Sequence, residues 1–438
     1  MPGRKLIIDC DAGVDDCQAL MLALSAHVRG ECEIVAITTV SGNVHIDKVI
    51  RNVRRCLAVK FIEQQQQHET ISNVLSIPVY YGASEALIVD VEEDHKHARF
   101  WHGNDGIGGA SVAVDVEIQN KLGKVTALRI LDARPTETTP AAVKLAQLCL
   151  GCPNKISIVA LGPLTNVALA CKLYPESFPI AVKEMIFMGG TRYARGNANL
   201  TAEFNAYADP EALQICLAAL QSRATMVGWD LTCNHGIPFD FVQSWFGNST
   251  SLTASGSAST TDDVSASMHT SASTSAAHSI DGTCPVGAFL SLISADIVHK
   301  SRHGPWQKAG LLIPDPLAMC VGIRPETVVK DSKSYFATVE LGGKRTRGQV
   351  VLDYDGLFTE KDDGTVEEEV EEEKAEEEQE KTSSKRKTKA KKENTAVKSH
   401  DDNRGKNGMR RNLKVITALN MDVVMSMLSQ STGVGGIM

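Results

Sequence analysis

A chain of 438 residues, of which 43% are hydrophobic and 22% charged, can bury a sizeable core as one large domain or as two to three smaller ones. Its formal net charge of −8 gives no overall basic field, which argues against nucleic acid or an anionic membrane as the default partner. Eleven cysteines at irregular spacings, a short stretch before the first apolar run and no membrane-length apolar segment predict a cytoplasmic protein with reduced thiols.

Strand-like and helix-like segments alternate along the chain. The apolar "KLIID" precedes the helical pattern "DDCQALMLALSAHV", and "EIVAITTV" precedes "IDKVIRNVRRCLAV". Further on, "ISIVAL" precedes "LTNVALACKLY", and "KEMIFMGG" is followed later by "DPEALQICLAALQS". These βα units predict an α/β fold with an open, Rossmann-like, mostly parallel sheet flanked by helices. Because ligands of such sheets bind outside the carboxyl ends of the strands, the residues after each apolar run are candidate site residues.

Oxygen-bearing groups follow these predicted strands. In chain order they are Asp9, Asp11, Asp15, Asp16, Asn43, Leu161 to Asn166, Met188 to Gly190, Asn197, Glu203, Asn205 and Asp315. Carboxylates placed close together repel one another and take up protons unless a cation neutralises them. Oxygens from several loops suit a hard divalent ion, Ca²⁺ or Mg²⁺, whereas zinc would call for a compact His/Cys cluster. The pattern therefore predicts a metal site at the strand ends.

Other interpretations of the aspartates fit less well. A helix N-cap would explain Asp15 or Asp16 alone, but not Asp9 and Asp11, which share one face of a strand. Aspartyl-phosphate hydrolases carry Thr or Val where this chain has Gly13. The segment lacks the later acidic positions of an EF-hand, and no G-x-G-x-x-G follows the first strand. Taken alone, the later Asn and Glu residues would be ordinary surface polar groups.

Two segments differ sharply from the rest in composition. Residues 248–283 are mostly Ser, Thr, Ala and Gly, which predicts a disordered insert. Residues 357–411 form a second insert, acidic first and basic after, and such charge blocks stay solvated. Residues 412–438 then supply a strand and an amphipathic helix, so we expect residues 1–438 to form one domain that this last segment completes. The basic run 385–392 leaves nuclear import open beside a cytoplasmic location.

Seven motifs together resemble the inosine-uridine type nucleoside hydrolases. They are "DCDAGVDD", "TTVSGN", "WHGNDGIGG", "VALGPLTNVALA", "FMGG", "GNANLTAEFNAYADPEA" and "PDPLAM". The resemblance covers nearly the whole chain outside the two inserts and implies the Rossmann-like nucleoside hydrolase fold. It also implies Ca²⁺-dependent hydrolysis of the N-glycosidic bond of ribonucleosides to free base and ribose, as in purine or pyrimidine catabolism or salvage. The expected partners are a small ribonucleoside and other copies of the chain, in a homodimer or homotetramer.

The resemblance implies a metal-binding set. Asp11, Asp16 and Asp315 would bind Ca²⁺ through carboxylate oxygens, and Leu161 through its backbone carbonyl. Ribose hydroxyls and one water would complete the roughly seven or eight oxygens that Ca²⁺ prefers. Asp11 would also act as the general base toward that water.

The resemblance also implies substrate contacts along the ribose. Asp15 and Asn205 would bind the 2′ and 3′ hydroxyls, Asn197 and Glu203 the 3′ and 5′ hydroxyls, while Asn43 and Met188 would line the pocket. A site built to bind hydroxyl groups disfavours substrates that lack them, so we expect ribose specificity.

One position departs from the family pattern. Pro314 stands before the last metal aspartate, where many members carry a histidine that protonates the departing base and purine-preferring members a tryptophan that stacks on it. Trp101, His102 and His235 are the candidates for contacts to the leaving base, and each could equally be pocket packing. Two alternative functions therefore stay open: a catalytically weak relative that binds nucleosides or ribose, and a scaffold that acts through its charged insert.

Overall fold

The structure is a computed structural model that describes residues 3–67, 74–88, 95–133, 138–246, 284–304, 307–358 and 410–433. The insert predicted at 248–283 lies outside the described residues, as does the insert predicted at 357–411 apart from its first two and last two positions. The basic run 385–392 lies outside them too.

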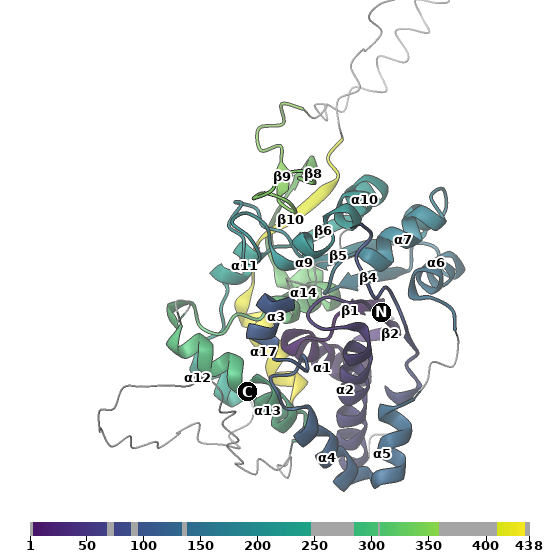
Figure 1. Ribbon diagram of the computed structural model, residues 1–438, viewed down its shortest axis with the longest axis vertical. Coiled ribbons are helices and arrows are strands. Elements are labelled where there is room, and N and C mark those ends of the chain that lie inside the picture. The colour runs from purple at the N-terminus through teal and green to yellow at the C-terminus, as the bar shows by residue number, and fades with distance from the viewer. Residues whose placement is uncertain are drawn as a thin grey trace, which may run out of the picture.

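An eight-stranded sheet forms the centre of the molecule, in the order β3-β2-β1-β4-β5-β6-β10-β7 (Figure 1). Neighbouring strands run parallel except β10 and β7, which are antiparallel. A separate antiparallel pair, β8 and β9, makes a second small sheet. The strands are β1 Arg4–Cys10, β2 Cys32–Thr39, β3 Val79–Tyr80, β4 Ile156–Ala160, β5 Glu184–Met188, β6 Ala224–Val227, β7 Val329–Tyr335, β8 Ala337–Val339, β9 Val350–Leu352 and β10 Leu413–Leu419.

Helices cover both faces of the sheet, as the fold class predicted from the sequence requires. They are α1 Val14–Val28, α2 Ile46–Gln66, α3 His95–His102, α4 Ser111–Leu122, α5 Lys124–Leu131, α6 Ala141–Gly151, α7 Thr165–Leu173, α8 Phe178–Ala181, α9 Phe204–Ala208, α10 Pro210–Leu220, α11 Trp229–Asn234, α12 Phe239–Trp245, α13 Pro285–His303, α14 Pro314–Ile323, α15 Pro325–Val328 and α17 Met421–Ser431. The four predicted βα units are confirmed as β1 with α1, β2 with α2, β4 with α7, and β5 with α10.

Two hydrophobic cores lie on opposite faces of the sheet. Alternate side chains of each strand enter different cores: in β1, Leu6 and Ile8 join the core beneath α1, α2, α13, α14 and α17, while Ile7 joins the core beneath α6, α7 and α10. This alternation is the two-residue period of a strand whose faces are both buried.

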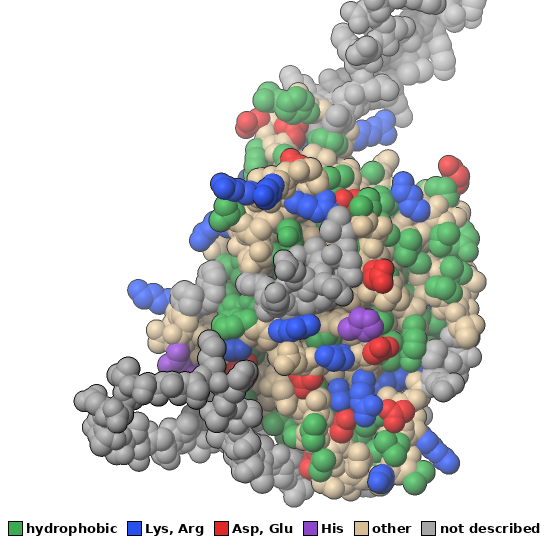
Figure 2. Space-filling model, viewed as in Figure 1, with side chains coloured by type: hydrophobic (Ala, Val, Ile, Leu, Met, Phe, Trp, Pro, Cys, Tyr) green, Lys and Arg blue, Asp and Glu red, His purple; other side chains and the backbone are tan. Residues whose placement is uncertain are grey.

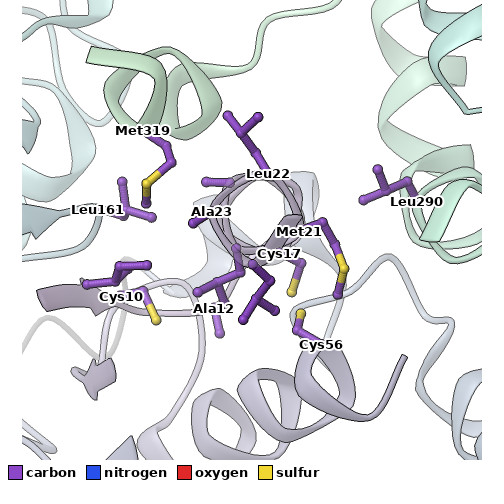
Figure 3. Close-up of a cluster of buried hydrophobic side chains, with 14 of the residues drawn as sticks. Cys10, Ala12, Cys17, Met21, Leu22, Ala23, Cys56, Leu161, Leu290 and Met319 are labelled. Atoms are coloured by element: carbon purple, nitrogen blue, oxygen red, sulfur yellow. The ribbon is translucent and has the colours of Figure 1, made fainter. Parts of the chain in front are cut away.

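Helix α1 is buried on all sides, because nearly every residue from Val14 to Val28 is shielded from solvent. Figure 3 views it end-on, with Cys10 from β1, Cys56 from α2, Leu290 from α13 and Met319 from α14 packed around it. A helix that is apolar all round belongs in a protein interior. Its first turn, which carries the aspartates, is therefore held rigidly by the core.

The chain after residue 411 enters the main sheet. Strand β10 lies between β6 and β7, and Ser431 at the end of α17 accepts a hydrogen bond from Ser25 of α1 through its carbonyl, at 2.8 Å. Trp245 Nε1 donates to the hydroxyl of the same Ser431 at 3.1 Å. The C-terminal segment thus packs within the same core as the N-terminal strand.

Basic and acidic side chains lie interspersed over the face shown in Figure 2, in keeping with the modest net charge. All eleven cysteines are free thiols, as their irregular spacing predicted. Within the described ranges, no helix combines the length and apolar character needed to span a membrane.

The strand order reverses between β1 and β4. From β1 the chain proceeds to β2 and β3 on one side, and from β4 to β5 and β6 on the other. At such a switch point the loops after the two strands diverge and leave a crevice outside their carboxyl ends. The segment after β1 carries the aspartates, and the segment after β4 begins at Leu161.

Candidate active site

The turn between β1 and α1 folds back onto its own backbone. Asp16 accepts hydrogen bonds from the backbone N–H of Asp11 at 3.2 Å and of Gly13 at 2.8 Å. Ala12, between them, has φ of 44°, a left-handed conformation that costs energy for a residue with a side chain. A Cβ on Gly13 would lie 2.6 Å from the amide nitrogen of Asn43, so only glycine fits there.

Asp11 is enclosed by backbone and has one oxygen unused. Its Oδ2 accepts from the backbone N–H of Asn43 at 2.6 Å. Glycines 42 and 162 pack directly on this carboxyl group, because a Cβ on either would come within 2.1 and 2.9 Å of it. Its Oδ1 is buried and has no hydrogen-bond partner within the part of the chain that the structure describes. Such an orphaned acceptor is a ready ligand for a cation.

Four carboxyl groups gather beneath the crevice. Asp15, Asp16 and Asp315 each present an oxygen within 4.8 Å of the other two, and the side chain of Asp16 also contacts that of Asp11. Asp315 lies in the first turn of α14, which packs against α1.

Burial perturbs all four carboxyl groups. It raises the pKa of Asp11 and Asp315 well above the usual range, and their acidic neighbours raise these pKa values further. Burial also raises the pKa of Asp16, and it raises the pKa of Asp15 to about 6. Among the described residues, the groups that donate to these carboxylates are backbone amides and the Asn43 side chain, with the His102 ring nearby, so the charge of four ionised groups calls for a cation. An all-oxygen set fits a hard divalent ion.

The sequence prediction and this geometry differ in one ligand. The predicted metal set was Asp11, Asp16, Asp315 and the carbonyl of Leu161, whereas the closest three carboxylates include Asp15 in place of Asp11. Asp11 still contacts Asp16 and keeps its orphaned Oδ1. The Leu161 carbonyl accepts from Asn205 Nδ2 at 2.6 Å, and its second lone pair is available to another partner.

The wall opposite the aspartates comes from the segment before and within α9. Glu203 caps α9 and accepts from the backbone N–H groups of Asn205, Ala206 and Gly190 at 2.8, 3.1 and 2.8 Å. Burial nevertheless raises the pKa of Glu203 to about 7. Asn205 is oriented by the carbonyls of Leu161 and Met188, which accept from its Nδ2 at 2.6 and 3.1 Å.

Asn197 and Asn43 complete the polar lining. Asn197 Oδ1 accepts from the backbone N–H of Phe204 at 2.9 Å, which leaves its amide N–H groups as donors. Asn43 Nδ2 donates to Asp16 at 3.1 Å. Asn197 is held by backbone and Asn43 by the side chain of Asp16, so both positions relative to the aspartates are set before any ligand arrives.

A pocket of about 280 Å³ joins these groups. It is lined by Asp15, Asn43, Ala98, Trp101, His102, Leu161, Met188, Gly196, Asn197, Glu203, Phe204, Asn205, Trp229, Ile297, Ser301, Leu312, Pro314 and Asp315. All six predicted substrate-binding residues are among them, while Asp11 and Asp16 lie beneath the lining. A concave, largely apolar pocket with a few convergent polar groups is the usual form of a small-molecule site.

Helix α3 brings Trp101 and His102 to the pocket. Lys300 of α13 donates to the carbonyl of Phe100, and its ammonium lies 4.4 Å from the centre of the Phe100 ring. The glycine-rich loop after α3 is shaped by Asp105, whose carboxylate accepts from three backbone N–H groups at 2.8 to 3.0 Å. Helices α3 and α13 thus form one wall of the pocket.

His102 adopts one tautomer when it is neutral. Its Nδ1 accepts from the backbone N–H of Val14 at 3.1 Å, so the ring proton resides on Nε2. Asp15 Oδ1 lies 3.6 Å from the same Nδ1, too far for a strong bond and in competition with Val14.

His235 does not reach the pocket, contrary to the expectation that it could contact the leaving base. It ends α11, where its Nδ1 donates to the carbonyl of Leu231 at 2.8 Å and its Nε2 accepts from the backbone N–H of Leu419 at 3.3 Å. Both nitrogens serve to join α11 to β10. Asp9 also stays apart, since its Oδ1 is bound by Thr38 and Asn166.

Comparison with known proteins identifies the family. A family model described as inosine-uridine preferring nucleoside hydrolase matches residues 6–425. The chain belongs to this family. The match confirms the resemblance inferred from the seven motifs.

Curated relatives of this nucleoside hydrolase chain match it over about half of its length. The inosine-uridine preferring nucleoside hydrolase of Leishmania major is 35% identical over 230 residues, which are 52% of this chain and 61% of the relative. Uridine nucleosidase 1 of Arabidopsis thaliana is 34% identical over 229 residues, which are 52% of this chain and 57% of the relative. The matched part thus spans less than two thirds of these relatives.

Solved nucleoside hydrolases share the fold. A purine-preferring ribonucleoside hydrolase from Gardnerella vaginalis superposes with a TM-score of 0.65 at 21% identity, over 99% of this chain and 100% of that one. An inosine-guanosine nucleoside hydrolase gives 0.63 at 23% identity, over 98% and 99%. At these identities the likeness shows the fold, and it confirms the predicted α/β architecture.

Several lining residues of this nucleoside hydrolase pocket carry no sequence motif. Trp229 directly follows β6 and Gly228, so the strand-end rule would have found it. Ile297 and Ser301 lie on α13, in the middle and last turns of a long helix that no strand precedes. The packing of α13 against α1, α2 and α3 brings them to the site.

Proposed function

We propose that this protein hydrolyses the N-glycosidic bond of ribonucleosides, with bound Ca²⁺, and releases free base and ribose. The observation that carries the proposal is the convergence of four buried carboxyl groups with Asn197, Glu203 and Asn205 at the switch point of the sheet. Membership of the nucleoside hydrolase family supports the same reaction.

Asp11, Asp16, Asp315 and the Leu161 carbonyl would hold the Ca²⁺, with Asp15 close enough to contribute. When bound, the ion would neutralise the buried carboxylates, orient the ribose hydroxyls and lower the pKa of a water. Calcium is favoured because the ligands come from separate loops and vary in spacing, whereas Mg²⁺ demands regular octahedral geometry.

Asp11 would serve as the general base. The N–H of Asn43 binds its Oδ2, so Oδ1, which has no hydrogen-bond partner among the described residues, would accept the proton from water. The water oxygen bonds to C1′ of the ribose as the C1′–N bond breaks, and that electron pair leaves with the base. The positive charge that develops on the ribose is stabilised by the surrounding carboxylates.

Ribose hydroxyls would be recognised by the fixed polar groups of the pocket. Asp15 and Asn205 would bind the 2′ and 3′ hydroxyls, and Asn197 and Glu203 the 3′ and 5′ hydroxyls. Because Asp15, Glu203 and Asn205 are buried and Asn197 is half-buried, a substrate without a hydroxyl would leave polar groups of the pocket unpaired. The 2′-deoxynucleosides should therefore be poor substrates.

His102 is the best candidate to protonate the leaving base. Pro314 lines the pocket but has no proton to give, and His235 is occupied elsewhere. His102 lines the pocket and carries its neutral-state proton on Nε2. Trp101, on the same helix, offers a face on which a planar base could stack.

A panel of ribonucleosides and 2′-deoxyribonucleosides, with chromatographic detection of free base, tests the proposal. Relatives named as uridine nucleosidase, inosine-uridine preferring and pyrimidine-specific hydrolases make uridine and inosine the first substrates to assay. Release of base from ribosides, dependent on Ca²⁺, is expected. Failure to release base from any ribonucleoside would contradict the function.

Because Pro314 cannot protonate the leaving base, we consider a second function, in which the protein binds nucleosides or ribose with little turnover. It predicts calorimetric binding of inosine without free base. The homodimer or homotetramer expected from the sequence stays a prediction.

A further inference from the structure

Helix α13 buries two serines that differ in their partners. Ser294 is fully buried, and its hydroxyl accepts from Gln18 Nε2 of α1 at 3.0 Å. Ser301, two turns later, is 4% exposed and lines the pocket. In the part of the chain that the structure describes, no group forms a hydrogen bond with the Ser301 hydroxyl, not even the carbonyl of the preceding turn.

The contrast follows from where the two hydroxyl groups lie: that of Ser294 is enclosed in the core, whereas that of Ser301 is not among the fully enclosed unpaired polar atoms of the described residues and opens onto the pocket. A hydroxyl group that faces a pocket and has no partner among the described residues can bond to a polar group of whatever enters the pocket. Ser301 also has an apolar setting. Ile297 lies one turn before it on the same face, and Trp101 comes from the neighbouring α3.

The polar groups that face the ribose lie on other elements. Asp15 belongs to α1, Asn43 follows β2, and Asn197, Glu203 and Asn205 belong to the segment ending in α9. Helices α3 and α13 contribute mostly apolar side chains, together with His102 and Ser301. A nucleoside has one polyhydroxylated end and one planar heterocyclic end, and the apolar wall suits the heterocycle.

We propose that Ser301 is a specificity-determining residue whose hydroxyl binds a polar edge of the leaving base. A hydroxyl both donates and accepts, so it can pair with a ring nitrogen, a carbonyl or an amino group of a purine or pyrimidine. This inference rests on the proposed hydrolysis of ribonucleosides and deepens it by assigning a contact to the base.

Steady-state kinetics of the full-length protein with saturating Ca²⁺ test the assignment. Ser301→Ala should lower kcat/KM for inosine and uridine roughly 5- to 10-fold, the value of one hydrogen bond in a buried site. The inhibition constant of D-ribose, which has no base, should stay unchanged. Ser301→Thr keeps the hydroxyl and should restore most of the loss.

Ser294→Ala is the matched control on the same helix. It removes a buried hydroxyl that is paired with Gln18, so it should lower the melting temperature and leave the ratio of kcat/KM to the ribose inhibition constant unchanged. If Ser301→Ala cleaves both nucleosides as fast as wild type, or weakens ribose as much as nucleoside, Ser301 is only a packing residue and the inference is wrong.

The outcome also separates this inference from the function on which it rests. Wild-type protein that releases no base from inosine or uridine would overturn the proposed hydrolysis. Calorimetric titration of inosine and of D-ribose into wild type and Ser301→Ala would then still measure the contact, since only inosine binding should weaken. Equal affinities of the two proteins for inosine would overturn the inference in that case too.

Discussion

The two sides of the pocket are built differently. The side proposed to hold the metal and the ribose is called the ribose side here. On it, Asp11 and Asp16 are fully buried. Asp16 accepts from backbone N–H groups of the turn that contains Gly13, and Asp11 accepts from the backbone N–H of Asn43.

The wall formed by α3 and α13, proposed to face the base, is called the base side here. On it, Trp101 is half-buried on the short helix α3. That helix is attached to α13 by Lys300, and Gly103, with φ of 72°, follows directly after it.

The difference shows how the fold divides its tasks. The residues of the ribose side follow strands of the central sheet or belong to the first turn of α1, so they cannot move without disturbing the core around α1. The base side is attached to that framework through a few side-chain contacts. We therefore expect substitutions on the ribose side to affect every substrate alike, and substitutions on the base side to act selectively.

Asp11→Asn should have the largest effect and should act on all substrates. It removes a negative charge from the metal site and the proposed base, so turnover at saturating Ca²⁺ should fall about 10³-fold or more. The melting temperature should stay near that of wild type, because asparagine can keep the hydrogen bond from Asn43.

Asp47→Asn, at the exposed start of α2, is the control and should be indistinguishable from wild type. Undiminished hydrolysis of inosine, uridine and 4-nitrophenyl riboside by Asp11→Asn would remove Asp11 from the mechanism.

Without Ca²⁺, the buried carboxyl groups of the ribose side should make the free energy of unfolding depend on pH. The folded pKa of Asp15 is about 6, above the value of about 4 for an unfolded aspartate. Between these values the folded state binds more protons than the unfolded state, so the free energy of unfolding falls as pH rises through this window. Asp15 alone contributes about 3 kcal/mol to the fall, and burial raises the pKa of the other site carboxyl groups in the same direction.

Thermal unfolding measures this effect. In EDTA the melting temperature should be higher at pH 5 than at pH 8, and millimolar Ca²⁺ should raise it most at pH 8, where the carboxylates must ionise. Equal amounts of Mg²⁺ should do less. If Ca²⁺ does not change the melting temperature at pH 8, the site carboxyl groups do not bind the metal.

Sequence reasoning located more of the pocket-lining residues at the strand ends than on the helices α3 and α13, for a physical reason. Asp11, Asn43 and Leu161 each follow a strand of a parallel sheet, and the topology gathers all strand ends at one edge. Ser301 reaches the pocket through helix packing, which leaves no local pattern. His235 is the opposite case: it lies near a strand end, but both of its ring nitrogens form hydrogen bonds that join α11 to β10, and it does not line the pocket.

Pro314→His should act selectively on the base side. If general acid catalysis is weak in the wild type, poor leaving groups suffer most, so 4-nitrophenyl riboside should be cleaved much faster than inosine or uridine. A histidine at position 314 should then raise turnover of the two nucleosides roughly 10-fold or more while hardly changing the activated riboside. Pro314 is the first residue of α14, where its fixed φ is helpful but not required.

If wild type instead cleaves inosine as fast as the activated riboside, another group protonates or stacks the base. His102→Gln should then reduce nucleoside turnover in proportion to the basicity of the leaving group, and Trp101→Ala should reduce it mainly for purines. Loss of both nucleoside and 4-nitrophenyl riboside activity to the same degree would show instead that α3 supports the ribose side.

Lys300→Met should give the smallest effect and the sharpest test of how α3 is held. Methionine keeps most of the apolar stem but loses the ammonium that bonds to the Phe100 carbonyl and lies over its ring. We expect KM for inosine and uridine to rise about 3- to 10-fold, within the value of one charge-assisted hydrogen bond and a partly exposed cation–π contact. The inhibition constant of D-ribose and the melting temperature should change little.

Asp296→Asn is the matched control, because it removes the 2.6 Å ion pair of Lys300 and leaves the contacts to Phe100 in place. Nucleoside KM should therefore rise in Lys300→Met and not in Asp296→Asn. An equal rise of KM in both variants would mean that nucleoside binding depends on the ion pair within α13 and not on the attachment of α3 to α13.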